Sequence, residues 1–161
     1  MKIRRRRDGA VVVSEIPQPV RLALLRLPLH LQISEGDSAH ARLFPNPGGD
    51  ADLGELWAEW VRPDLAKSFD TAERTVGMQL RRALGKESAE AGLIITPPLR
   101  DAWMHVLNRA RLAIFERHDF SEEELEVKFP GEITTERDLL RWELAVYQVL
   151  LEVLVDAECE P

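Results

Sequence analysis

The sequence predicts a mainly α-helical single domain: one bundle of four to five helices with a small N-terminal antiparallel β-hairpin. Three patterns lead to this prediction. Apolar residues recur every three or four positions over long segments, which is typical of helices that pack on a core. Asp8-Gly9 is a turn signal between two short runs that favour strands. The last segment, residues 134–156, is apolar on nearly all sides, so we expect the other segments to surround it.

Length and composition limit the classes of protein to which the chain can belong. Its 161 residues fit one domain, and its apolar fraction of 45% and charged fraction of 30% are ordinary for a globular protein. No run approaches the roughly 18 uncharged apolar residues of a membrane span, and the N-terminus does not read as a signal peptide. The single Cys159 excludes an internal disulfide framework and suits a reducing compartment, so we expect a cytoplasmic protein.

The N-terminal segments divide into a hairpin and a helix. We expect residues 1–15 to form the hairpin, with a two-residue turn at Asp8-Gly9 because both positions tolerate positive φ. Residues 17–33 keep helical spacing, and Pro28 would kink a helix there. Residues 27–33 also alternate as a strand does, so both readings stay open, with the kinked helix favoured.

The rest of the chain is a loop followed by the helical core. Residues 34–51 are rich in Gly, Pro, Asn and Asp and predict a loop, and residues 52–161 form the core. Asp52 opens a short helix, and a longer amphipathic helix runs from Pro63 to about Leu84. The remaining predicted elements are a helix from Pro97 to about His118, a capped acidic turn at Ser121–Glu124 and the final helix.

A basic run near the N-terminus is the sharpest charged feature. It consists of Lys2, Arg4, Arg5, Arg6 and Arg7. Such a run could contact phosphates, but the chain as a whole carries a net charge of −7, and alternate residues of a strand point to opposite faces. Residues 116–161 contain four Lys or Arg against fourteen Asp or Glu. We therefore favour an edge strand protected against pairing, with ion pairs to the acidic C-terminal region.

Two of the four tryptophans are candidate contact residues. Trp103 and Trp142 fall on apolar stripes and are expected in the core. Trp57 and Trp60 lie three residues apart, on one face of the short helix beside the predicted loop. Core packing is the plainer interpretation of this pair, whereas an aromatic anchor on an exposed groove would be a binding hot spot.

No catalytic, cofactor-binding or metal site is predicted. The four histidines include no pair spaced by four residues, and the glycines fit neither a phosphate-binding loop nor a dinucleotide turn. No serine lies in a nucleophile elbow. Glu143 stands among apolar residues, and we expect it in water or in an ion pair with a cation such as Arg111 or Arg141.

The order of segments resembles a bacterial family known as domain of unknown function 2017. The matching segments are the Arg-rich hairpin ending in Asp8-Gly9, the leucine-rich helix interrupted by Pro28, Ala41–Pro45, Trp103 with Leu107–Leu112, and Ala145–Tyr147 in the last helix. The resemblance spans nearly the whole chain and implies no known reaction. Genes of this family often lie beside one for a small adaptor of the Clp protease, which implies a link with protein quality control.

We predict a non-catalytic, cytoplasmic protein-interaction or regulatory module without a cofactor. Its predicted contact areas are the Trp57 and Trp60 surface and the acidic C-terminal region. The expected partner is another protein, or a second copy bound through the last helix, and not a membrane. The alternatives are a nucleic-acid-associated protein that uses the basic run and an enzyme with an unrecognised pocket between helices.

Overall fold

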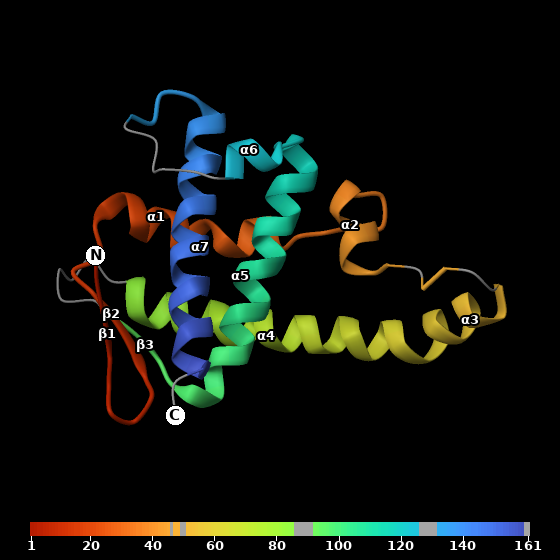
Figure 1. Ribbon diagram of the computed structural model, residues 1–161, viewed down its shortest axis with the longest axis horizontal. Helices are drawn as coiled ribbons and strands as arrows, with labels where there is room; N and C mark the ends of the chain where they lie inside the picture. Colours follow the sequence, from red (N-terminus) through yellow and green to blue (C-terminus); the bar gives the residue numbers. More distant parts are fainter. Residues whose placement is uncertain (46, 49–50, 86–91, 126–131, 160–161) are drawn as a thin grey trace.

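Helices make up most of the protein, and the predicted mainly α fold is confirmed (Figure 1). The computed structural model describes residues 1–45, 47–48, 51–85, 92–125 and 132–159. The strands are β1 (Lys2–Arg5), β2 (Val11–Ser14) and β3 (Leu93–Ile95). The helices are α1 (Gln18–His30), α2 (Ser38–Leu43), α3 (Ala51–Leu56), the π-helical η1 (Trp57–Val61), α4 (Arg62–Leu84), α5 (Pro97–His118), α6 (Glu122–Leu125) and α7 (Glu136–Cys159).

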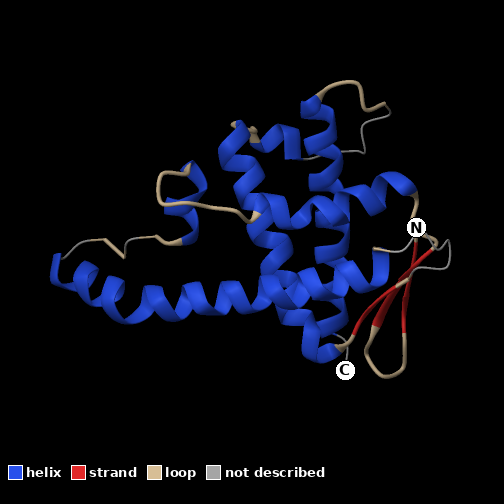
Figure 2. Ribbon diagram, turned by 180° about the vertical axis from the view of Figure 1, so that it is seen from behind, coloured by secondary structure: helices blue, strands red, loops and turns tan. Residues whose placement is uncertain are grey.

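The strands form one antiparallel sheet in the order β1-β2-β3 at one end of the molecule (Figure 2). The hairpin of β1 and β2 is confirmed, but the sequence does not predict β3. Val11 lies opposite Ile95 and Val13 opposite Leu93, and all four side chains are buried. A two-stranded ribbon is marginal in water, so β3 gives β2 the second neighbour and the apolar face that it needs.

The hairpin turn differs from the predicted two-residue turn. The Arg6 amide donates to the Ala10 carbonyl oxygen at 2.8 Å, and the Gly9 amide donates to the Arg6 carbonyl oxygen at 3.0 Å, so three residues form the loop. Gly9 has a φ of 77°, whereas Asp8 keeps a negative φ and accepts from the Ala10 amide through its side chain at 3.1 Å. A three-residue loop with glycine in the left-handed region is a common hairpin connection.

Helix α1 settles the ambiguity at residues 27–33. The helix continues through Pro28 and ends at His30, so the strand interpretation of this segment is wrong. Leu24 and Leu27 are fully buried on its inner face. Pro28 lies inside the helix and provides no amide donor for the Leu24 carbonyl oxygen, and the helix ends two residues later at His30.

The predicted loop at residues 34–51 contains a helix that the prediction missed. Helix α2 begins after Asp37, whose side chain accepts from the Ala39 amide at 2.9 Å as an N-cap. Ala39 and Leu43 are buried and attach α2 to α5. Gly and Pro on both sides of this segment suggested a loop, but a cap and two buried apolar residues are enough for a short helix.

Helices α3 and α4 were predicted as separate, yet they form one continuous rod from 51 to 84. Pro63, in the first turn of α4, has no amide hydrogen, and its ring would clash with the carbonyl group four residues earlier. The π-helical turn η1 comes directly before it, and there the Arg62 amide donates to the Trp57 carbonyl oxygen, five residues back. The wider turn accommodates the proline without a break in the rod.

The centre of the fold is α5 rather than the last helix. In the described part of the chain, α5 packs against α1, α2, α4, α7 and β3, whereas α7 packs against α1, α5 and α6. Trp103, Leu107 and Ile114 of α5 are fully buried. No residue of α7 between Leu140 and Leu151 is exposed. The prediction that other elements cover this helix is therefore confirmed, but the helix that the other elements surround is α5. None of the described helices has the length and apolar content to cross a membrane.

Candidate interaction surfaces

The first part of the rod projects from the body as an arm. We call residues 51–61, which form α3 and η1, the arm; it extends away from the sheet at the opposite end of the molecule (Figures 1 and 2). Within the described chain, α3 packs with η1 and η1 packs with α4, and neither packs extensively against another element. The arm is therefore open to a second molecule.

Apolar side chains gather on this arm. Trp60 is 67% exposed and Leu56 is 55% exposed, and Leu53 and Val61 are each nearly half exposed. Trp57 is partly buried. Core packing, the plainer interpretation of the tryptophan pair, is therefore wrong for Trp60. Large apolar side chains clustered on an uncovered surface are typical of binding sites.

Acidic residues accompany the apolar face of the arm. Asp52, Glu55 and Glu59 are exposed, and residues 51–61 contain no Lys or Arg. The first basic residue of the rod is Arg62, whose guanidinium donates to Glu35 at 2.9 Å. The arm is thus both apolar and negatively charged.

A second apolar stripe lies on the outer face of α1. Leu22 and Leu29 are about half exposed and Leu25 is more than one-third exposed. The positions 22, 25 and 29 are spaced by three and four residues, so they lie on one face of the helix. The basic residues Arg21 and Arg26 flank the stripe, and α1 contains no Asp or Glu. We call these three leucines the α1 stripe.

The basic run lies far from the arm, at the sheet end of the molecule (Figure 1). Lys2 Nζ donates to Glu15 at 2.7 Å, and the Arg6 guanidinium lies 3.2 Å from the Asp8 carboxylate. Arg5 lies 3.8 Å from Asp156 in α7, which is the ion pair with the acidic C-terminal region that the sequence suggested. The run follows an edge strand and then a turn, so its charges do not form one basic face.

A buried polar cluster joins α1 to α7. Glu143 is 0% exposed, and its carboxylate binds the Arg26 guanidinium and, at 2.8 Å, His30 Nε2. Glu143 was expected in water or in an ion pair with a cation such as Arg111 or Arg141; it is buried, and its partners come from α1. One helical turn later, the Tyr147 hydroxyl donates to the Ala23 carbonyl oxygen at 2.8 Å, and burial raises the pKa of Tyr147. These contacts hold α1 in place and leave its leucine stripe on the outside.

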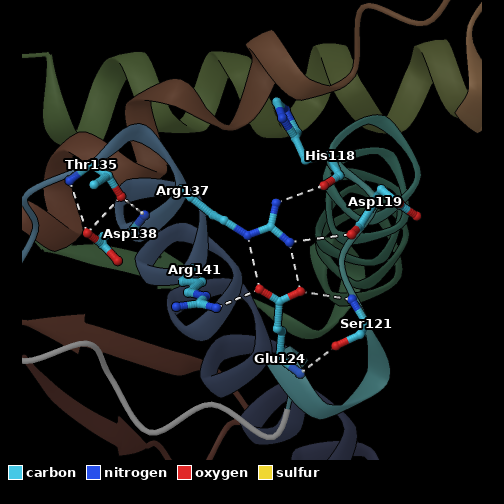
Figure 3. Close-up of polar contacts among 8 residues, drawn as sticks. All are labelled: His118, Asp119, Ser121, Glu124, Thr135, Arg137, Asp138 and Arg141. Carbon is cyan, nitrogen blue, oxygen red and sulfur yellow. Dashed lines mark hydrogen bonds and ion pairs between the residues drawn. The ribbon is translucent and has the colours of Figure 1, made fainter.

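A second polar cluster fixes the start of α7 (Figure 3). The Glu124 carboxylate accepts from the Ser121 amide at 3.0 Å and from Arg137 at 2.7 Å, and Arg141 binds it as well. Hydrogen bonds from Arg137 are the main reason that the pKa of Glu124 falls to about 2. Arg137 also donates to the His118 carbonyl oxygen at 3.1 Å, so the cluster joins the end of α5 to α6 and α7. The predicted capping box at Ser121 is confirmed, and the role of the cluster is structural.

This architecture belongs to a known protein family. The family model described as Domain of unknown function (DUF2017) matches residues 4–157, which reach from β1 into the last turns of α7. The chain belongs to this family. The resemblance noted in the sequence is confirmed. No curated protein and no solved structure gives a significant match to this DUF2017 chain.

Helix α4 lines several hollows in the described part of the DUF2017 chain. A groove of about 720 Å³ lies between α4 and α5, with Asp64, Lys67 and His105 among its lining residues. A smaller pocket of about 330 Å³ contains Arg109, whose guanidinium stacks 4.2 Å from the Phe69 ring and lies 3.9 Å from Glu73. Among the described residues, no group of three or more His, Cys, Asp or Glu could hold a metal ion.

The predicted contact residues of the DUF2017 chain do not form one site. The basic run lies at the sheet end, and Trp57 and Trp60 lie on the arm at the other end (Figure 1). The other apolar residues of the two exposed surfaces were not predicted as contact residues: Leu53, Leu56, Val61, Leu22, Leu25 and Leu29. Their spacing could have identified them, because α1 and the arm each carry apolar residues on a second helical face.

Proposed function

We propose that this DUF2017 chain is a non-catalytic, cytoplasmic protein-interaction module that binds its partner through the arm. The observation that supports this proposal is the apolar face of the arm, with Trp60 and Leu56 more than half exposed on a projecting helix. Amphipathic helices are a recurrent recognition element in protein complexes because they present anchors at intervals of three and four residues.

The energetics favour a binding role for this face. Burying a large apolar side chain stabilises a complex by about 1.5–3 kcal/mol, and the exposed fraction of each residue scales that gain. Trp60 alone could therefore contribute about 2 kcal/mol, which is the usual threshold for a hot spot. Because the Trp60 side chain is exposed in the free protein, it adds little to the free energy of unfolding.

The two alternative functions have weaker structural support. An enzyme needs a pocket in which polar groups converge on a substrate; the pocket of about 330 Å³ around Arg109 has polar groups, but Arg109 is engaged with Glu73 and the Phe69 ring of its own chain. A nucleic-acid binder needs a continuous basic face, whereas carboxylates lie beside Lys2, Arg5 and Arg6. The family resemblance implies that genes of this family often lie beside a gene for a Clp adaptor. Components of Clp-type quality control are therefore one class of candidate partner.

The test is affinity capture from the native cell with the tagged full chain, followed by mass spectrometry. The Trp60→Ala variant should lose the partners that the wild-type chain retains. Met78→Ala is the control, because Met78 is a large apolar side chain that is 43% exposed on α4, outside the arm. If Trp60→Ala together with Leu56→Ala captures the same proteins as the wild type, the arm is not the binding surface and the proposal fails.

A further inference from the structure

We propose that the pocket around Arg109 binds a free α-amino acid with an apolar side chain. The pocket has a volume of about 330 Å³ and lies where α2, the first half of α4 and α5 meet. A volume of this size suits a small molecule. None of the described residues of the arm lines the pocket, so the site is separate from the surface of the proposed function.

The guanidinium of Arg109 is the feature of this pocket that points to a ligand. The Arg109 side chain is only 9% exposed, and its Nε and Nη1 atoms have no hydrogen-bond partner in the described part of the chain. A guanidinium keeps its positive charge and carries five N–H donors. Buried donors are nearly always hydrogen-bonded in folded proteins, so an oxygen acceptor from outside the chain is expected here.

The contacts that Arg109 makes within the chain do not satisfy its donors. The guanidinium lies 4.2 Å from the centre of the Phe69 ring, and this cation–π contact is not a hydrogen bond. Nη1 lies 3.9 Å from Glu73 Oε2, which is too far for a hydrogen bond. Burial raises the pKa of Glu73 and lowers the pKa of Arg109, so neither charge fully balances the other.

Two carboxylates line the same pocket, those of Asp70 and Glu73, nearly one turn apart on α4. Neither accepts a hydrogen bond in the described part of the chain. The other ion pair of the pocket, Arg62 with Glu35, is joined at 2.9 Å. The groups left for a ligand are thus one guanidinium and two carboxylates. A simple anion would meet the carboxylates and a simple cation would meet the guanidinium, whereas a molecule with both charges is attracted by all three.

A free α-amino acid carries these two charges close together. Its ammonium and carboxylate are attached to one carbon atom, so the groups that bind them must be neighbours, as Arg109 and Glu73 are. The carboxylate accepts from Arg109, in a pairing that guanidinium groups favour, and the ammonium donates to Glu73 and Asp70. Apolar residues line the rest of the pocket and cover the side chain of the ligand: Leu31, Ile33, Phe44, Ala66 and Phe69.

The test is equilibrium dialysis of the full chain against L-valine, L-leucine, L-methionine and L-phenylalanine, whose side chains span the apolar sizes. At least one of them should bind with a dissociation constant in the micromolar to millimolar range. The N-acetyl derivative of the best ligand lacks the ammonium, and its amide lacks the carboxylate. Each should compete at least about tenfold more weakly than the parent, because it leaves a charged group of the pocket unmatched.

Variants of the charged groups locate the bound molecule. Arg109→Gln and Glu73→Gln should each weaken binding by about tenfold or more, since each removes a charge-assisted hydrogen bond. Asp70→Asn should weaken it by about threefold, because Asp70 is exposed to water. Asp101→Asn is the matched control: Asp101 is an exposed carboxylate on α5 outside this pocket, and the variant should bind as wild type does. Circular dichroism checks the fold, and the exposed Asp70 keeps the test open even if Arg109→Gln does not fold.

Three results overturn the inference. The first is a wild-type chain that binds none of the four amino acids at millimolar concentration, because the pocket then holds only water. The second is a derivative that competes as well as the parent: the amide would indicate the N-terminus of a peptide, and the N-acetyl form a simple carboxylate. The third is binding that Glu73→Gln and Asp70→Asn leave unchanged. None of these results bears on the proposed function, which fails only if capture of other proteins is independent of Trp60 and Leu56.

Discussion

Glu143 places a carboxyl group where water is excluded, and its partners come from a helix more than one hundred residues earlier in the chain. Removing a charged group from water costs several kcal/mol, which the attraction and hydrogen bonds of Arg26 and His30 offset. The arrangement is sensitive to the loss of either partner. It fixes α1 at one position along α7, because no other register gives the carboxylate the same bonds.

Replacing Glu143 should therefore be costly for stability. We expect Glu143→Gln to lower the free energy of unfolding by about 3 kcal/mol, because an amide cannot balance the charge of Arg26. Urea unfolding followed by circular dichroism measures the difference. Glu123→Gln is the control, since Glu123 is exposed and should change stability by less than about 0.5 kcal/mol. Equal midpoints for Glu143→Gln and wild type would contradict the assigned role of the cluster.

Glu124 gives the stability of the protein a component that depends on pH. Its pKa is about 2 in the folded chain, below the ordinary value of 4.5, chiefly because Arg137 donates to it. Because the pKa of Glu124 is lower in the folded chain than in the unfolded chain, its carboxylate adds to the free energy of unfolding. This contribution is complete above pH 4.5 and is lost as the pH falls toward 2. Unfolding midpoints of wild type and Glu124→Gln should thus converge between pH 4.5 and pH 2. A constant difference over this range would show that the carboxylate does not titrate as described; Glu123→Gln again serves as the control.

At the scale of elements, the arm and α5 are opposites. Helix α5 packs against five other elements, whereas the arm packs extensively only within its own rod in the described chain. Amide exchange reports the free energy of local opening, which is small where few contacts are buried. We expect amides of residues 51–61 to exchange far faster than those of residues 103–114, as measured by hydrogen–deuterium exchange of the dilute protein. Equal protection in the two segments would contradict an uncovered arm.

The sequence predicted the long helices well because their signals are local. Helix α5 begins at Pro97 and ends at His118, where it was expected, since prolines open it and periodic apolar residues fill it. The short elements were missed. Strand β3 has three residues and exists because β2 lies beside it, and α2 depends on burial against α5. Neither dependence can be read from local composition.

The candidate site was predicted only in part, for a related reason. Trp57 and Trp60 could be selected by residue type, but their exposure depends on the direction of the whole rod. The rod is continuous because a π turn comes directly before Pro63. The sequence prediction instead placed the start of a new helix at this proline. The predicted partners of Glu143 were wrong because its actual partners lie on α1, and the packing of α1 on α7 cannot be read from local sequence.

At the scale of the whole molecule, the residues that build the fold and those that face a partner are separate sets. The core is continuous from the sheet through α1, α4 and α5 to α7, and none of the arm residues whose side chains are described belongs to it. The net charge of −7 adds a general repulsion between copies of the chain.

This separation predicts a variant that folds normally and does not bind. Replacing Leu53, Leu56 and Trp60 together by serine should change the free energy of unfolding by no more than about 1 kcal/mol, because none of them is buried. Trp103→Ala, in the centre of α5, should cost about 3–5 kcal/mol. Urea unfolding of the dilute protein, where any dimer has dissociated, compares the two. A triple variant as unstable as Trp103→Ala would show that the arm belongs to the folding core, and the exposed tryptophan would then need no partner.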